Sequence, residues 1–247
     1  MFHERSIRHA LLLAAIGLLP FSVEAAAGKD VNLLPVPVPP GILLPVTLET
    51  TIRAQKVQPG MPIRCKLAQR VPLGNKQYIP RGTTLLGHVV AAGPDSLSLA
   101  FTDLRLREKS VPVSVRLIAA ASWYAVYQAE LPVGGTDRST SNPADWTTQQ
   151  VGGDQVYRAA GFGGVYNSAS EPVGNADLWG VYSLPGKDGV PLAMGPFSTT
   201  AKGLFDLRHV EIVASGGPAH APIAFHMKKT GRWRLERQGA LLLQVTG

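Results

Sequence analysis

The chain has a single cysteine, and its neighbours have charges that could activate it. Cys65 lies between Arg64 and Lys66. A cysteine is nucleophilic as the thiolate, which nearby cations or a helix N-terminus stabilise. The sequence alternates here, with Ile63, Cys65 and Leu67 in one register and the two cations in the other. Because alternate side chains of a strand point to opposite faces, we predict a buried thiol with its cations turned away.

Three ionisable residues in FDLRHVEI could bind a metal or transfer protons. They are Asp206, His209 and Glu211, and on a strand the last two would share one face. A zinc site needs three or four ligands at known spacings, and the sequence contains neither HExxH nor CxxC. We interpret the group as a solvated outer face. We therefore predict no catalytic residue, no metal and no cofactor.

Aromatic side chains and carboxylates in residues 121–200 offer a different chemistry. Trp146 and Trp179 could stack on sugar rings. A glycosidase needs two carboxylates at a defined separation, and nothing in the sequence pairs any two of the acids here. Large aromatic side chains also dominate burial, so we interpret these aromatics first as core. The alternative hypothesis is a secreted glycan-binding or glycan-cleaving module, which requires both tryptophans and nearby acids to line one groove.

The formal net charge is +7, and the basic residues are unevenly spread. Residues 51–94 contain seven basic side chains and no acid, and a second cluster occupies residues 228–237. The candidates for binding a partner or an anion are Arg64, Lys66, Arg70, Lys76, Arg81, Lys228, Lys229, Arg232 and Arg234. Basic patches favour envelope proteins, further copies of the chain, the cell wall or an anionic lipid surface. Nucleic acid is expected only within a DNA-transfer complex. The simpler interpretation is a solvated strand face.

The N-terminal segment predicts export. Residues 1–25 have basic residues, a short apolar run and a small-residue cleavage pattern, which are typical of a signal peptide. Residues 26–40 form a proline-rich linker, which predicts a stiff, extended spacer. A single cysteine cannot form an internal disulfide. We expect the mature chain in the periplasm or the outer envelope.

The remaining chain predicts an all-β fold, a small antiparallel barrel or sandwich. Residues 41–120 show short alternating runs separated by turns, and their register switches near Thr102 and Asp103, which predicts a bulge. VPVSVRLIA predicts one strand, with Val111 to Leu117 on one face at alternate positions. SWYAVYQAEL could be a helical turn or a strand. We expect residues 121–200 to be a loop-rich β insertion and residues 201–247 to add strands that complete the sheet.

One part of the chain resembles a known family. The run PPGILLPVTLETTIRAQKVQPGMPIRCKLAQRV is followed by YIPRGTTLLGHVV, SLSLAFTDLRL and SVPVSVRL. Together these resemble the β-barrel of TrbI-like channel subunits of conjugal-transfer and type IV secretion systems. The family features matched are Gly41, Leu44, Pro45, Val46 and Leu48, then Ile79, Pro80, Gly82, Thr83, Leu85 and Gly87. The resemblance covers about residues 40–117 and implies a β-barrel there.

The resemblance also implies a place in an envelope complex. The family's cytoplasmic tail and retained membrane helix are replaced here by a short signal, and residues 121–200 are too rich in glycine and proline for the family's helical antenna. Our first hypothesis is therefore an exported, non-enzymatic structural or assembly component of the bacterial envelope, linked to a secretion or conjugation type of complex.

Overall fold

The described part of the chain is residues 37–106, 109–133, 145–228 and 233–247 of a computed structural model. These residues belong to one unit, Asn32–Gly247. The expected signal segment, most of the expected linker, Lys229 and Arg232 lie outside the described residues. Among the described residues, no helix is long and apolar enough to cross a membrane.

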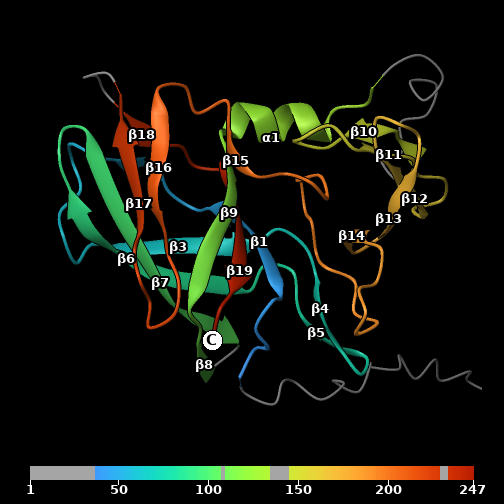
Figure 1. Ribbon diagram of the computed structural model, residues 1–247, viewed down its shortest axis with the longest axis horizontal. Coiled ribbons are helices and arrows are strands. Elements are labelled where there is room, and N and C mark those ends of the chain that lie inside the picture. Colours follow the sequence, from blue (N-terminus) through green and yellow to red (C-terminus); the bar gives the residue numbers. More distant parts are fainter. Residues whose placement is uncertain (1–36, 107–108, 134–144, 229–232) are drawn as a thin grey trace, which may run out of the picture. The chain divides into compact units, whose positions relative to one another are not determined.

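A curved sheet organises the fold (Figure 1). Ten strands of the described chain form it: β1 (Leu43–Leu48), β3 (Pro62–Leu67), β6 (Thr84–Ala92), β7 (Ser96–Leu106), β8 (Lys109–Pro112), β9 (Val115–Ala121), β15 (Gly203–Phe205), β16 (Val210–Ser215), β17 (Ile223–Met227) and β19 (Ala240–Val245). Their order is β15-β9-β19-β1-β3-β6-β7-β17-β16, with β8 beside β7. Arg116 of β9 bridges to Gly216 after β16, so the sheet curls into a partial barrel. The all-β prediction is confirmed.

The strand pairing is antiparallel throughout this sheet except at one end. Only β15 and β9 run parallel among its described strands. The last strand, β19, lies between β1 and β9 and pairs with both. The last strand of the chain therefore lies next to the first.

Smaller elements extend the sheet. Two short pairs are β2 (Ile52–Arg53) with β18 (Arg234–Leu235), and β4 (Val71–Gly74) with β5 (Gln77–Ile79). A second sheet holds β10 (Thr148–Gln149), β11 (Gln155–Val156), β12 (Gly163–Tyr166), β13 (Pro172–Asp177) and β14 (Gly180–Ser183). The helix α1 (Trp123–Glu130) follows β9 directly. Thus the expected β insertion has strands of its own.

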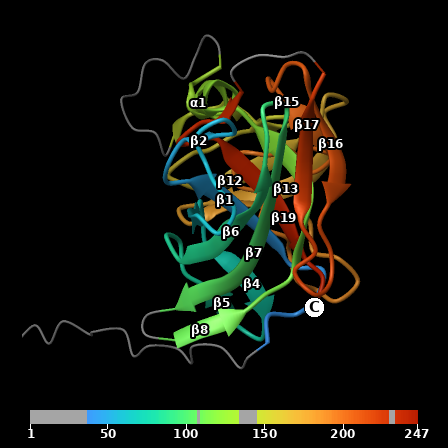
Figure 2. The same cartoon turned by 90° about the vertical axis from the view of Figure 1, so that its left-hand side faces the viewer.

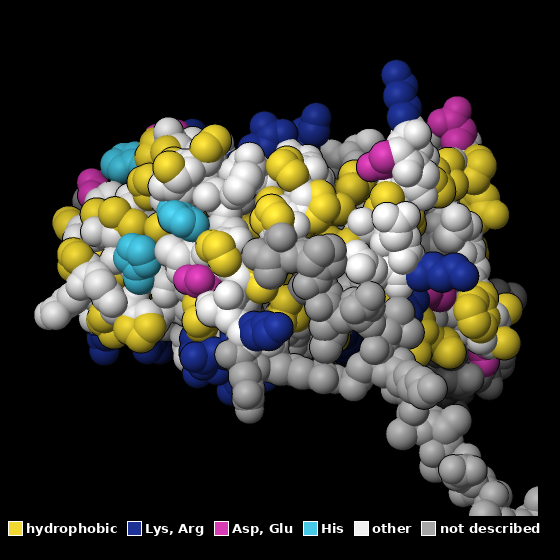
Figure 3. Space-filling model, turned by 90° about the horizontal axis from the view of Figure 1, so that it is seen from below, with side chains coloured by type: hydrophobic (Ala, Val, Ile, Leu, Met, Phe, Trp, Pro, Cys, Tyr) yellow, Lys and Arg dark blue, Asp and Glu magenta, His cyan; other side chains and the backbone are white. Residues whose placement is uncertain are grey.

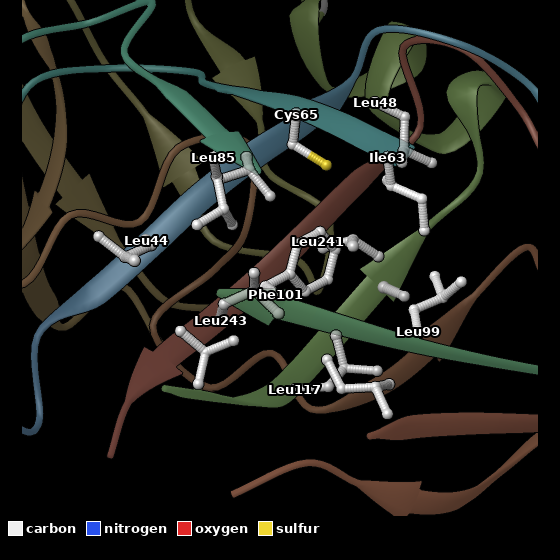
Figure 4. Packing of buried hydrophobic residues seen from close by; sticks show 14 of the residues in the cluster. Leu44, Leu48, Ile63, Cys65, Leu85, Leu99, Phe101, Leu117, Leu241 and Leu243 are labelled. Atoms are coloured by element: carbon white, nitrogen blue, oxygen red, sulfur yellow. The ribbon is translucent and has the colours of Figure 1, made fainter. Parts of the chain in front are cut away.

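The interior of the curved sheet is the main core. In β3, Ile63, Cys65 and Leu67 are buried while Arg64 and Lys66 are exposed, which confirms the predicted register. Cys65 has no exposed surface. It points toward leucines and a phenylalanine from β1, β6, β7 and β19 (Figure 4). Burying one such large apolar side chain stabilises the fold by roughly 1.5–3 kcal/mol.

A second hydrophobic cluster covers the outer face of β9, β19 and β1. Its buried members are Leu43, Ala119, Ala121, Val126, Val151, Met194, Phe197, Ala201, Ala240 and Leu242. Alternation alone would leave Pro45 of β1 facing solvent, but Pro45 is buried and packs against Gly195. The strand is buried on both faces because α1 and residues 192–201 cover it.

The predicted bulge is present in β7. Leu86 pairs with Asp103 and Gly87 with Phe101, so Thr102 is the extra residue. A Cβ added at Gly87 would lie 2.3 Å from the carbonyl oxygen of Ala100, a backbone atom. Glycine is therefore required where β6 and β7 approach at the bulge.

The prediction of one strand over VPVSVRLIA is wrong. The chain bends at Val113 and Ser114 and gives β8 and β9, which pair with β7 and β19. The Val113 N–H donates to the Thr102 oxygen at 2.8 Å, and the Ser114 N–H donates to the Gly247 oxygen at 3.0 Å. The four alternating apolar residues are nevertheless all buried, because both strands face the same core.

The sequence did not decide between a helical turn and a strand for SWYAVYQAEL, and the structure has the helix α1 there. Ser122 caps it, because its Oγ accepts the N–H of Ala125 at 3.1 Å. One side of the helix buries Val126 against the second cluster. The other side exposes three aromatic rings, Trp123, Tyr124 and Tyr127.

The interpretation of the insertion's aromatics as core is wrong for most of them. The buried cluster of the second sheet is aliphatic: Val156, Val165, Ala176 and Val181. Of the six aromatics in question only Tyr182 is buried, whereas Trp146, Tyr157, Phe162, Tyr166 and Trp179 keep part of their surface accessible. Small residues suffice to fill a sheet of short strands, so the large rings are left at the surface.

Candidate ligand-binding groove

An acid that directly follows β1 partly neutralises the predicted basic face of β3. Glu49 lies just before the acid-free stretch, and its carboxylate contacts Arg64 Nε at 3.2 Å and Lys66 Nζ at 3.0 Å. The hydrogen bond from Lys66 is the main cause that lowers the pKa of Glu49; desolvation opposes it, and the charges of Lys66 and Arg64 add to the lowering. These two cations are therefore less available to an external anion than their sequence spacing implied.

Arg70 is held by the second sheet. Its Nη2 lies 3.4 Å from Asp177 Oδ2, and its guanidinium carbon lies 5.0 Å from the Tyr78 ring centre and 5.1 Å from that of Trp179. Cation–π contacts of this kind add to the ion pair. Arg70 thus connects the β4–β5 hairpin to the turn that carries Trp179.

The remaining basic candidates are dispersed. Lys228 pairs with Glu211 at 3.1 Å and Arg234 with Glu236 at 2.6 Å. Within the described part of the chain, Lys76 and Arg81 form no ion pair, and they lie in separate turns. On the face seen in Figure 3, the Lys and Arg side chains lie in several separate groups. The structure therefore does not gather the basic residues into one patch.

Cys65 and the FDLRHVEI residues do not form a reactive site. Burial, and then the charge of Glu49, raises the pKa of the Cys65 thiol far above its usual value. His209 has a φ of 63° and precedes β16, so it does not share a strand face with Glu211 as the sequence suggested. Asp206 accepts the Ser122 hydroxyl at 2.7 Å. No three His, Cys, Asp or Glu residues among those described are grouped to hold a metal.

Trp146 and Trp179, by contrast, line the same groove. Its volume is about 540 Å³, within the range of small-molecule sites. The walls come from the curved sheet, from α1 and from the second sheet: Thr47, Ala68, Gln69, Arg81, Val126, Ala129, Glu130, Trp146, Thr148, Gln150, Val156, Arg158, Gly161, Asp177, Leu178, Trp179, Gly180, Val181, Gly195 and Pro196. Two acids, Glu130 and Asp177, are among them. This is the arrangement that the glycan hypothesis required.

Gln69 joins the curved sheet to the second sheet at the base of the groove. Its side chain is 4% exposed. Its Oε1 accepts the N–H groups of Val181 and Gly195, and its Nε2 donates to the Val181 oxygen, each at 2.9 Å. A Cβ on Gly180 would lie 2.5 Å from Gln69 Cδ. The amide therefore ties Val181 of β14 and Gly195 to the segment between β3 and β4, and it fixes the groove wall.

A turn presents Trp179 to the groove. Asp177 Oδ1 accepts the N–H of Trp179 at 2.7 Å and that of Gly180 at 2.9 Å. Asp and Gly three residues apart are typical of such turns, and this was the available local signal for the site. The Trp179 side chain is 57% exposed although Arg70 stacks on it. The indole is thus oriented by its own turn and remains accessible.

Polar groups accompany the two indoles. Burial lowers the pKa of the half-buried Arg158, and the charge of Asp177 opposes that shift. Gln150 donates from Nε2 to the oxygens of Gly195 and Phe197, at 2.9 and 2.7 Å. Its buried Oε1 has no hydrogen-bond partner among the described residues. The Arg158 guanidinium therefore stands at the groove wall, and the buried Gln150 amide supports the wall from behind.

Comparisons with models of protein families, with curated proteins and with solved structures find no significant match. The resemblance of residues 40–117 to TrbI-like proteins stays a prediction.

Proposed function

We propose that this protein is an exported, non-enzymatic glycan-binding protein of the bacterial envelope, and that the groove is its binding site. The observation that carries the proposal is the meeting of Trp146 and Trp179 in one groove, from positions far apart in the sequence. A sugar ring has an apolar C–H face and a rim of hydroxyls. An indole accepts the face by stacking, and charged or amide groups bond the rim.

The polar lining supports binding through hydroxyl groups. Arg158 and Arg81 are donors, and Glu130 is an acceptor. The lining therefore fits a polyhydroxylated ligand better than an apolar one.

Binding is favoured over cleavage because one groove acid is already committed. Asp177 accepts two backbone N–H groups through Oδ1 and pairs with Arg70 through Oδ2. A glycosidase needs one carboxylate free to act as acid and another as base or nucleophile. With Asp177 holding the Trp179 turn, a catalytic pair is not supported.

Tryptophan fluorescence tests the proposal. Soluble glycan fragments of the bacterial cell wall are titrated into wild-type protein, into W179A and into the control W123A, whose site lies outside the groove. We expect a saturable change for wild type and W123A, and at least about tenfold weaker binding for W179A, since stacking is worth more than 1 kcal/mol. Equal affinity in W179A, or no saturable change in wild type, would refute the groove as a glycan site.

The assembly hypothesis stays a prediction with its own test. Reversing Arg64, Lys66, Arg70 and Lys76 together should abolish partner capture if these residues form the interface. Arg70 also supports the Trp179 turn, so the informative variant leaves it unchanged. Cross-linking in native cells with wild type and R64E/K66E/K76E then decides, and unchanged capture would leave these cations as a solvated face.

A further inference from the structure

The outward side of α1 carries a cluster of exposed aromatic rings. Trp123, Tyr124 and Tyr127 are 41%, 51% and 48% exposed. The Trp123 ring centre lies 5.9 Å from that of Tyr124 and 6.1 Å from that of Tyr127. Scattered exposed apolar residues are ordinary, but a contiguous group of large rings indicates an interaction surface. Trp and Tyr in particular are suited to a boundary with an apolar and a wet side.

Arginines adjoin this cluster. Trp123 shares a shallow recess of about 340 Å³ with Arg53, Arg234 and Arg237. Arg53 of β2 is the cross-strand neighbour of Arg234 of β18. Two like charges in such neighbouring positions are unfavourable without a counter-charge. Glu236 supplies one negative charge to Arg234. The recess therefore keeps an excess of positive charge.

A neighbouring recess continues the same surface. Arg208 lines it together with Trp123 and Tyr124. Asp206 lies 4.0 Å from Arg208 Nε and also accepts the Ser122 hydroxyl. Across both recesses, four arginines face two carboxylates, which leaves two positive charges in excess.

We propose that this end of the molecule, with α1, β2 and β18, binds the surface of an anionic lipid bilayer. α1 and β18 lie along the upper edge of Figure 1, α1 and β2 lie in the upper part of Figure 2, and β2 pairs with β18. The rings would enter the headgroup boundary while the arginines contact phosphates, the combination typical of interfacial binding. The surface lies outside the groove, so the proposal stands whether or not the groove binds a glycan.

Co-sedimentation with lipid vesicles tests the surface. Wild-type protein is mixed with vesicles of phosphatidylglycerol and phosphatidylcholine, or of phosphatidylcholine alone. We expect binding to the anionic vesicles, weaker binding to the neutral ones, and loss of binding as salt is raised. Wild-type protein that stays in the supernatant with anionic vesicles would overturn the proposal and leave a protein as the partner of this face.

Two variants assign the binding to these residues. Y124S/Y127S removes exposed rings, and R53E/R237E reverses two charges while keeping the Arg234–Glu236 pair. Each should bind anionic vesicles about tenfold or more weakly. The matched control is R105E/K109E, which reverses two exposed charges where β7 pairs with β8, and β8 lies at the lower end of Figures 1 and 2. Equal binding by the four proteins, each with a wild-type unfolding transition, would overturn the proposal.

Discussion

At the scale of single residues, Cys65 shows which properties of a side chain can be predicted from the alternation of apolar and polar residues. Its register was predictable because β3 has one buried and one exposed face, so the sequence pattern and the structure have the same period. Its charge neighbourhood was only partly predictable. Glu49 pairs with Arg64 and Lys66 through the β1–β3 register, which no local pattern of the sequence contains.

The buried thiol predicts a loss of stability at high pH. Burial raises the pKa of Cys65 in the folded state, while the unfolded thiol ionises near pH 9. Above that pH the unfolded state binds fewer protons, so stability should fall by up to about 1.4 kcal/mol per pH unit from this group. Urea unfolding from pH 7 to 10.5 measures it. The stability advantage of wild type over C65A should be constant below pH 9 and shrink above it; a constant advantage throughout would contradict the burial.

Gln69 is the residue on which the groove wall depends, and its sequence neighbourhood gave no indication of that role. Q69L should lower the free energy of unfolding by about 2–3 kcal/mol, because it leaves the N–H groups of Val181 and Gly195 without their acceptor. Chemical denaturation measures the loss. The control Q128L, at an exposed position of α1, should change stability by less than about 0.5 kcal/mol. Similar values for the two variants would contradict the bridging role.

At the scale of elements, prediction succeeded where one face of a strand is exposed and failed where both are covered. The bulge at Thr102 was visible as a switch of register within a run. The burial of Pro45 and the break between β8 and β9 were not visible, because they depend on what packs outside β1 and on where β7 and β19 lie. The periodicity of a sequence segment indicates which side chains share a face of the strand. It does not indicate which distant elements cover that face or pair with the strand, and these decide the burial of Pro45 and the break between β8 and β9.

The contact between β6 and β7 predicts a strong effect of a small change. G87A should destabilise the protein by about 2–3 kcal/mol, since its new methyl would meet the Ala100 oxygen at 2.3 Å and must displace backbone. Thermal and urea unfolding measure it. G217A is the matched control, because its methyl would make an ordinary contact at 3.9 Å with Ala221. An unchanged stability for G87A would show that the bulge can widen without cost.

At the scale of the whole molecule, the groove exists only because distant segments meet. Gln69 and Arg81 lie on either side of the β4–β5 hairpin, Glu130 ends α1, Trp146 lies just before β10, and Trp179 lies in the turn between β13 and β14. The sequence named both tryptophans as candidates from their chemistry. It could not place them in one groove, because that depends on long-range closure through the bonds of Gln69 and the ion pair of Arg70.

The most direct measurement is the response of the indole N–H signals in a two-dimensional ¹H–¹⁵N spectrum during titration with cell-wall glycan fragments. The chain has four tryptophans, so the spectrum carries its own controls. We expect the indole signals of Trp146 and Trp179, which line the groove, to shift on titration. The signals of Trp123 and Trp233, which do not line it, should keep their chemical shifts. Four unchanged signals at saturating ligand, or shifts confined to Trp123 and Trp233, would contradict this expectation.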